Sequence, residues 1–186
     1  FVVKYGVPVA GMMSTWNGPP PTTRIFASGP TAGTVSGVPE ESLVEVRSDS
    51  PYGVEWTVPD PANWRSLDTM DVRLINDDGV ALEVQWDEAA NTFRVLNEQS
   101  GEYSAAFQPG SSKRFDSPDV TLLLRDTTVT GSGPDGPSVL LDLLLRFKQK
   151  AVNTSYRVEA RAIDDEGNVQ DWTPAGTIVV LPRSHN

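Results

Sequence analysis

Apolar and polar residues alternate one by one through long stretches of the chain from residue 44 onward. In the segment 80–87 every second residue is Val, Leu, Val or Trp, and in 156–162 every second residue is Tyr, Val or Ala. A β-strand turns successive side chains to opposite faces, so this period of two predicts strands with one buried face. Turn-forming clusters, such as Asn-Asp-Asp-Gly at 76–79, separate the strands. Many short strands of this kind predict an all-β sandwich or barrel.

The segment 139–147 is rich in leucine and fits two structures. Asp142 and Arg146 are four residues apart, as in a helix with an ion pair, and Pro137 could begin such a helix. However, its apolar residues would surround a helix instead of forming a stripe on one side. We therefore expect a strand whose alternate residues point inward, paired next to the strand that contains Tyr156.

The first 43 residues differ from the rest of the chain. They contain six of the fifteen prolines and six of the fifteen glycines, and three of the prolines are consecutive, at 19–21. Proline lacks an N–H and fixes φ, so it does not fit the middle of a β-ladder. We expect 1–43 to be an extended lead-in or linker, 44–182 to be the β-sandwich and 183–186 to be a disordered tail.

Charge and composition exclude several classes of function. The formal net charge is −10, whereas binding to a nucleic-acid backbone requires clustered Lys and Arg. The chain has no cysteine, which excludes thiol catalysis, disulfides and cysteine-rich zinc sites. The longest unbroken apolar run, 178–181, is too short to cross a membrane as a helix. We expect neither nucleic-acid binding nor membrane insertion.

Residues 154–168 read TSYRVEARAIDDEGN, and residues 175–180 read AGTIVV. These segments resemble the F strand, the FG turn and the G strand of immunoglobulin-like or fibronectin type III-like modules of bacterial secreted or surface proteins. The pattern Tyr156-x-Val158-x-Ala160 is similar to the tyrosine corner of that fold. The resemblance implies an antiparallel immunoglobulin-like β-sandwich of about eight to ten strands. It also implies that Tyr156 is buried, with its hydroxyl bonded to backbone a few residues upstream.

The longer stretch 63–180 is similar to repeated modules of large bacterial exoproteins, which are usually spacers or adhesion units. The resemblance implies a non-catalytic structural or adhesion module of a larger extracellular or cell-surface protein. Its partners would be neighbouring domains of the same chain or a surface protein. Two alternatives stay open: a carbohydrate-binding module with a polysaccharide as its partner, and a carboxylate-type hydrolase.

Few residues point to catalysis. His185 is the only histidine, so neither a Ser-His-Asp triad nor a histidine-based metal cluster can form. The glycines at 131, 133 and 136 match G-x-G-x-x-G, but no strand–helix alternation surrounds them, and a flexible loop explains them. A hydrolase would therefore need a carboxylate pair, and the sequence singles out none. We expect no enzyme activity.

Acidic residues are concentrated in the predicted turns. If the strands follow the immunoglobulin order, several of these turns meet at one end of the sandwich. The residues concerned are Asp60, Asp68, Asp87, Glu88, Asp126, Asp135, Asp164, Asp165 and Asp171. Calcium takes about six to eight oxygen ligands, so Asp164, Asp165 and Asn168 would be its ligands in the FG turn. The alternative is that these residues cap a hairpin. We expect no cofactor, with calcium as the alternative.

Three of the five tryptophans, Trp16, Trp64 and Trp172, fall in predicted loops. Trp64 lies between Asn63 and Arg65, and Trp172 follows Asp171. Exposed aromatic rings in loops stack on sugars, so Trp64 and Trp172 are the candidate residues for carbohydrate binding. The alternative is that each ring is folded over the end of the sandwich.

Overall fold

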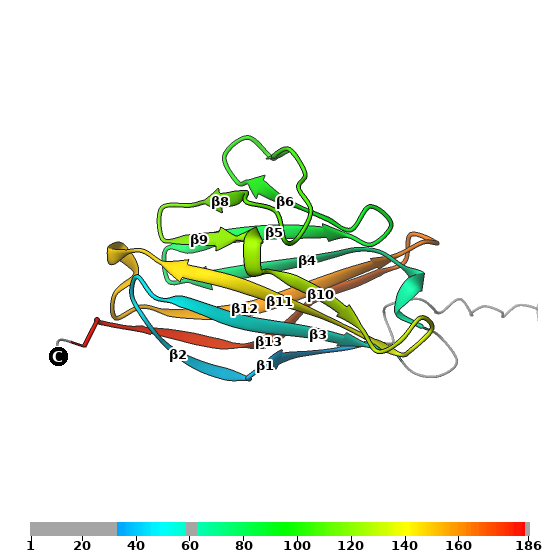
Figure 1. Cartoon of the computed structure of the whole chain (residues 1–186), viewed down its shortest axis with the longest axis horizontal. Coiled ribbons are helices and arrows are strands. Elements are labelled where there is room, and N and C mark those ends of the chain that lie inside the picture. The colour runs from blue at the N-terminus through cyan, green and yellow to red at the C-terminus, as the bar shows by residue number, and fades with distance from the viewer. Residues whose placement is uncertain (1–32, 59–62, 185–186) are drawn as a thin grey trace, which may run out of the picture.

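The computed structural model describes residues 33–58 and 63–184, and this part of the chain forms two β-sheets packed face to face (Figure 1). The six-stranded sheet contains β1 (Thr34–Val38), β3 (Asp49–Thr57), β8 (Arg114–Asp116), β9 (Val120–Leu123), β10 (Thr128–Gly131) and β11 (Ser138–Phe147). The seven-stranded sheet contains β2 (Glu41–Glu45), β4 (Leu67–Asn76), β5 (Gly79–Asp87), β6 (Thr92–Asn97), β7 (Glu102–Tyr103), β12 (Ser155–Asp164) and β13 (Val169–Leu181). Within the described residues, three short 3-10 helices connect strands: η3 (Trp64–Ser66), η4 (Leu124–Asp126) and η5 (Gln149–Ala151).

The strand order identifies an immunoglobulin-like β-sandwich, as predicted. One sheet has the order β1-β3-β11-β9-β8, with β10 also paired to β11, and the other has the order β2-β13-β12-β4-β5-β6-β7. These are the A-B-E-D and G-F-C arrangements of that fold, with further strands beyond C as in variable-type domains. All pairings are antiparallel except that between β2 and β13. In the described ranges, no helix has the length and apolarity needed to cross a membrane.

The described strands begin before the predicted boundary at residue 44. β1 pairs with β3 in one sheet and β2 pairs with β13 in the other, so this part of the predicted lead-in belongs to the sandwich. Both are edge strands, where a ladder needs hydrogen bonds on one side only, and Pro39 lies at the crossing between the sheets, where no N–H is required. Residues 1–32 of the predicted lead-in and 185–186 of the predicted tail lie outside the described residues. The described residues form thirteen strands: β1 and most of β2 precede the predicted sandwich, and the eleven from β3 to β13 include short strands inside predicted loops.

The leucine-rich segment is the strand β11, as the sequence predicts. Val139, Leu141, Leu143, Leu145 and Phe147 are buried between the sheets. The expected neighbour was wrong, however. β11 pairs with β3, β9 and β10, while the strand containing Tyr156, β12, lies in the opposite sheet. Strands close in sequence usually pair, but the connection through η5 crosses from one sheet to the other, which alternation alone does not reveal.

Tyr156 is fully buried, as predicted, and its ring lies 5.2 Å from that of Phe147 across the sheet interface. The predicted bond to backbone was wrong: its hydroxyl donates to the carboxylate of Asp119, at 3.2 Å. Asp119 is itself buried and forms an ion pair with Lys150 at 2.8 Å, so it supplies an acceptor that the sequence pattern did not indicate. Burial, followed by the charge of Asp119, raises the pKa of Tyr156 to about 12.

Substituting Tyr156→Phe should lower the free energy of unfolding by about 1–2 kcal/mol, because the buried carboxylate of Asp119 loses a donor. Urea titration followed by tryptophan fluorescence measures this change. The matched variant Tyr103→Phe removes a hydroxyl that is only half-buried, so it should cost less. Equal stability of wild type and Tyr156→Phe would contradict a structural role for the Tyr156–Asp119 bond.

Candidate functional site

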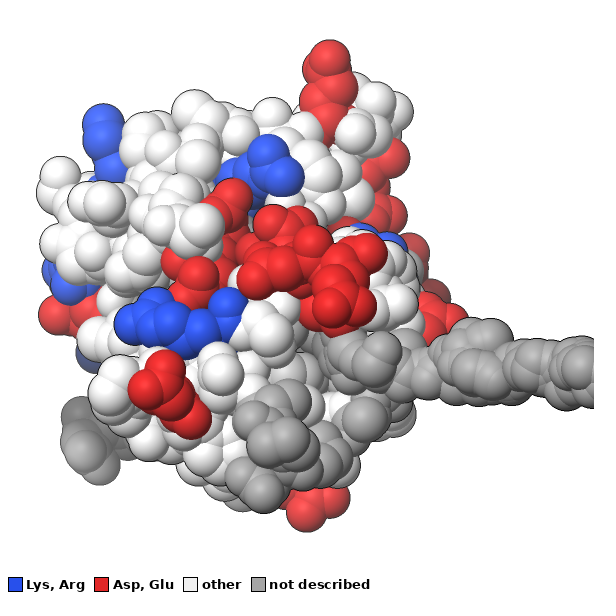
Figure 2. Space-filling model, turned by 90° about the vertical axis from the view of Figure 1, so that its right-hand side faces the viewer, with Lys and Arg blue, Asp and Glu red and all other residues white. Residues whose placement is uncertain are grey.

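The acidic turns meet at one end of the sandwich, as the strand order predicted. Asp165 N donates to Ser66 O at 2.9 Å, Trp64 N to Gly136 O at 3.0 Å and Glu88 N to Asp68 O at 3.0 Å, so four loops are joined there. Figure 2 shows a cluster of acidic side chains in the middle of this end. The predicted acids on or next to these loops are Asp68, Asp87, Glu88, Asp135, Asp164, Asp165 and Asp171.

Two members of the predicted acidic group are not placed at this end. Asp60 lies outside the described residues. Asp126 is joined through Arg125, at 2.8 and 2.7 Å, to Asp49 at the start of β3. The acidic loops lie at the opposite end of β3, just after Thr57, where Val58 N donates to Pro137 O at 2.9 Å.

The three predicted calcium ligands are close together in the β12–β13 turn, but Asp164 is already used by the turn itself. Its carboxylate accepts hydrogen bonds from Glu166 N at 3.0 Å, Asn168 N at 2.8 Å and Asn168 Nδ2 at 3.0 Å. This is the hairpin-capping arrangement that Asp favours in turns. Among the described residues, no group of three His, Cys, Asp or Glu side chains is placed to hold a metal ion.

Trp64 is buried, with 7% of its surface exposed. Its ring packs against Trp86 with centroids 6.5 Å apart, and its Nε1 donates to Gly133 O at 2.8 Å. The glycine-rich segment 131–136 therefore has a packing role in the β10–β11 loop: a Cβ at Gly131 would lie 2.3 Å from the Trp64 ring. Too little of the ring is accessible for a sugar to stack on it.

Trp172 is half-buried and lies in β13, where the sequence predicted a loop. The guanidinium of Arg73 lies 3.9 Å from the ring centroid and that of Arg161 lies 4.9 Å from it. Trp64 packs on the core residue Trp86, whereas Arg73 and Arg161 belong to the outer face of the seven-stranded sheet. The two candidate tryptophans are thus on opposite faces of one sheet, and the structure does not bring them into one binding platform.

The outer face of the seven-stranded sheet carries a network of charged side chains that the sequence did not predict. Asp71, with 0% of its surface exposed, accepts hydrogen bonds from Arg161 Nε at 2.9 Å and Gln85 Nε2 at 2.7 Å. Arg94 donates to Gln85 Oε1 at 2.8 Å, and its guanidinium lies over the ring of Tyr103. Each of these polar groups is satisfied by a neighbour on an adjacent strand, which lets a charged residue be buried.

One carboxylate on this face is left over. Arg73 lies between Glu83 on β5 and Glu159 on β12 in the strand register. Its guanidinium donates to Glu159 at 3.1 and 2.8 Å, and Arg157 also pairs with Glu159. Glu83 has no hydrogen bond or ion pair from its side chain to any described residue, although only 6% of its surface is exposed. Burial, followed by the charge of Asp71, raises the pKa of Glu83.

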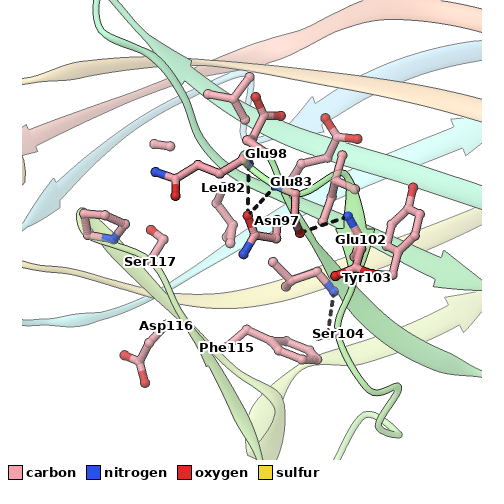
Figure 3. Close-up of a pocket in the computed structure, with 17 residues that line it drawn as sticks. Leu82, Glu83, Asn97, Glu98, Glu102, Tyr103, Ser104, Phe115, Asp116 and Ser117 are labelled. Atoms are coloured by element: carbon pink, nitrogen blue, oxygen red, sulfur yellow. Dashed lines mark hydrogen bonds between the residues drawn. The ribbon is translucent and has the colours of Figure 1, made fainter.

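Glu83 lines a groove of about 610 Å³ on the open side of the sandwich, which we call the β5 groove (Figure 3). β6 pairs with β5 only along Val84–Asp87 and then turns away to pair with β7. The first half of β5 therefore has β4 on one side and the groove on the other. The opposite wall comes from the other sheet, at Phe115–Pro118. The sequence showed Glu83 only as one of several outward polar residues in an alternating strand, because strand register decides which acid lacks a partner.

Comparisons with known proteins give no family: no family model and no curated protein matches this chain. Among solved structures, a marsupial T cell receptor is similar at 8% identity and a TM-score of 0.42, over 83% of this chain and 54% of that one. A structure on T cell activation by the superantigen toxic shock syndrome toxin-1 is similar at 16% identity and a TM-score of 0.35, over 80% and 99%. A DUF4466 family protein from Parabacteroides merdae is similar at 11% identity and a TM-score of 0.31, over 78% and 43%. The match to the receptor spans about half of that chain. TM-scores this low carry no evidence on the fold, which rests on the strand order alone.

Replacing Asp164 by alanine should destabilise the β12–β13 turn by about 1 kcal/mol, because backbone N–H groups lose their acceptor. Melting curves of the wild type should be identical in calcium and in chelator, since the Asp164 oxygens already accept hydrogen bonds within the turn. A melting temperature that rises with calcium concentration, and does so only when Asp164 is present, would instead support the calcium site.

Substituting Glu83→Gln should stabilise the protein at neutral pH, raising the melting temperature by roughly 2 °C. The raised pKa means that ionised Glu83 lowers the stability of the folded protein. The wild type therefore becomes less stable than the variant as pH rises above the ordinary glutamate pKa of 4.5 and through the raised value. Below that range both side chains are neutral and the two proteins should melt alike. Calorimetric scans from pH 3.5 to 7.5 test this. A variant that melts lower than the wild type at neutral pH would show that Glu83 is a structural residue.

Proposed function

We propose that this chain is a non-catalytic structural module that spaces neighbouring domains of a larger extracellular or cell-surface bacterial protein. The observation that carries this proposal is the position of the two ends of the sandwich. Gly33, just before β1, accepts a hydrogen bond at 3.0 Å from Gln170 at the start of β13. Ser184, just after β13, donates at 2.7 Å to Glu45 of β2, which pairs with Leu181 at the other end of β13. The chain thus enters at one end and leaves at the other (Figure 1).

The separation between entry and exit is close to the length of β13. This strand has thirteen residues, and at ~3.3 Å per residue it spans roughly 40 Å. Domains joined before β1 and after β13 would be held apart by that distance. A module that brought its two ends together would instead place its neighbours side by side.

The pairing of β2 with β13 suits a module under tension. The two strands are parallel and are flanked by the bonds Thr177 N to Glu40 O and Val46 N to Leu181 O, both 2.9 Å. Tension on the two ends pulls β2 toward the entry and β13 toward the exit. The strands would have to slide along each other, so the hydrogen bonds between them resist together.

A carboxylate-type hydrolase is the second candidate, and the β5 groove is the observation in its favour. A glutamate with a raised pKa can act as a general acid, and Glu98, Glu102 and Asp116 also line the groove. Incubation with a panel of oligosaccharides separates the candidates. Hydrolysis that disappears in Glu83→Gln would support the enzyme and contradict a non-catalytic module.

Two proline substitutions in β2 test the spacer proposal in a single-molecule pulling experiment on the full chain. Glu40 O and Val46 N face β13, so alternation along the strand points the N–H of Ser42 at β13 and that of Leu43 away from it. Ser42→Pro should therefore remove a ladder bond worth about 1 kcal/mol and raise the unfolding rate under force about fivefold. Leu43→Pro introduces the same ring on the same strand without this loss and should unfold nearly as slowly as the wild type. Equal rates for the two variants would contradict a role of β2–β13 in resisting tension.

A further inference from the structure

The β5 groove has the size and the lining of a ligand site. Its volume of about 610 Å³ lies within the range of about 300–1,000 Å³ that is typical of small-ligand pockets. On the face of β5 that carries Glu83, the groove is lined by Ala81, Leu96 and Tyr103. On the other face of β5 it is lined by apolar residues of both sheets: Val80, Leu82, Val95, Phe115 and Pro118. None of the described strands pairs with β5 before Val84 on this side, so its backbone adds free donors and acceptors.

The charge of the groove has one sign. Glu83, Glu98, Glu102 and Asp116 line it, and no Lys or Arg in 33–58 or 63–184 does. Asp116 is neutralised from outside the groove by Arg114 and Lys148, at 2.8 and 3.2 Å. Glu98 and Glu102 are exposed to solvent. Glu83 differs from all three because it is more than nine-tenths buried and has no partner among the described residues.

A largely buried carboxylate without a partner is costly, and such groups cluster at functional sites. The two guanidiniums nearest to Glu83 are committed elsewhere: Arg73 to Glu159 and Arg161 to Asp71. If Arg73 turned to Glu83, Glu159 would keep Arg157 alone, and if Arg161 did so, Asp71 would keep Gln85 alone. A cation from outside the network pairs with Glu83 without either loss.

We propose that the β5 groove binds an alkylammonium group, with Glu83 as the counter-charge and with Ala81, Leu96 and the ring of Tyr103 in contact with the alkyl chain. An ammonium carries three N–H donors, which suit one carboxylate together with nearby backbone carbonyls. Calcium fits less well, because it needs about six to eight oxygen ligands and Glu83 is one isolated carboxylate. The alkylammonium can be a free amine or a lysine side chain of a partner protein, which share this chemistry.

Titration of the full chain with hexylamine, followed by amide chemical shifts in NMR, tests the proposal. Shifts should concentrate at 80–83 and 95–97. Hexanol, which has the same chain without the charge, should bind at least about tenfold more weakly, the factor expected for one charged hydrogen bond. Glu83→Gln should weaken hexylamine binding by the same factor. Glu166→Gln, the same change in the exposed β12–β13 turn, should not alter it.

A second variant guards against a folding defect in Glu83→Gln. Glu98→Lys lies at an exposed position on the rim and places an ammonium group within the chain beside Glu83, so it should compete with hexylamine and raise the melting temperature. Equal binding of hexylamine and hexanol, or equal losses in the Glu83 and Glu166 variants, would overturn the proposal.

The source of the ammonium is decided with a blocked Val-Lys-Val tripeptide and the same peptide containing norleucine in place of lysine. Tighter binding of the lysine peptide than of hexylamine supports a partner protein as the source. Weaker binding supports a free amine. Equal binding of the lysine and norleucine peptides would contradict recognition of the ammonium.

Discussion

The structure depends on the contact between β11 and β12 across the two sheets. Phe147 and Tyr156 meet there, and the inner residues of both strands form a continuous buried layer. Because this layer is apolar, it forces the alternate residues of β12 and β4 outward. These outward residues are mostly charged, so the apolar core and the charged outer face arise from the same alternation. Buried polar contacts also join the two layers: Tyr156 donates to Asp119, Trp56 to Gln170 and Tyr52 to Ala175 O.

The outer face of the seven-stranded sheet distributes its charges unevenly. Arg73 and Arg161 each have a choice of acidic neighbours, and each makes its bonds toward β12 or β4 and not toward Glu83. Both guanidiniums also lie against the ring of Trp172, and these cation–π contacts stabilise the observed orientations of the two arginines. Glu83 is left unpaired at the edge where β6 turns away from β5. A binding site and a structural network are thus linked through the orientation of two arginines.

The sequence predicted the fold class and most strands, since alternation reports directly on burial. It placed β11 correctly as a strand and gathered the acidic turns at one end. It did not predict which sheet β11 joins, because that depends on the crossing at η5. It placed Trp172 in the loop before the last strand, whereas β13 begins earlier, at Val169, and includes this residue. Glu83 was missed because the lack of a partner depends on cross-strand register and on the orientation of Arg73, neither of which composition encodes.

The free edge of β5 has a consequence for how copies of this protein meet in concentrated solution. An unpaired strand edge invites pairing with the edge of another molecule, which is a common start of aggregation. Here the edge is bordered by acidic side chains, and a second copy would bring the same charges to the same place. The resulting repulsion protects the edge without a covering strand. The feature that leaves the groove open to a cation therefore also closes it to another copy of the chain.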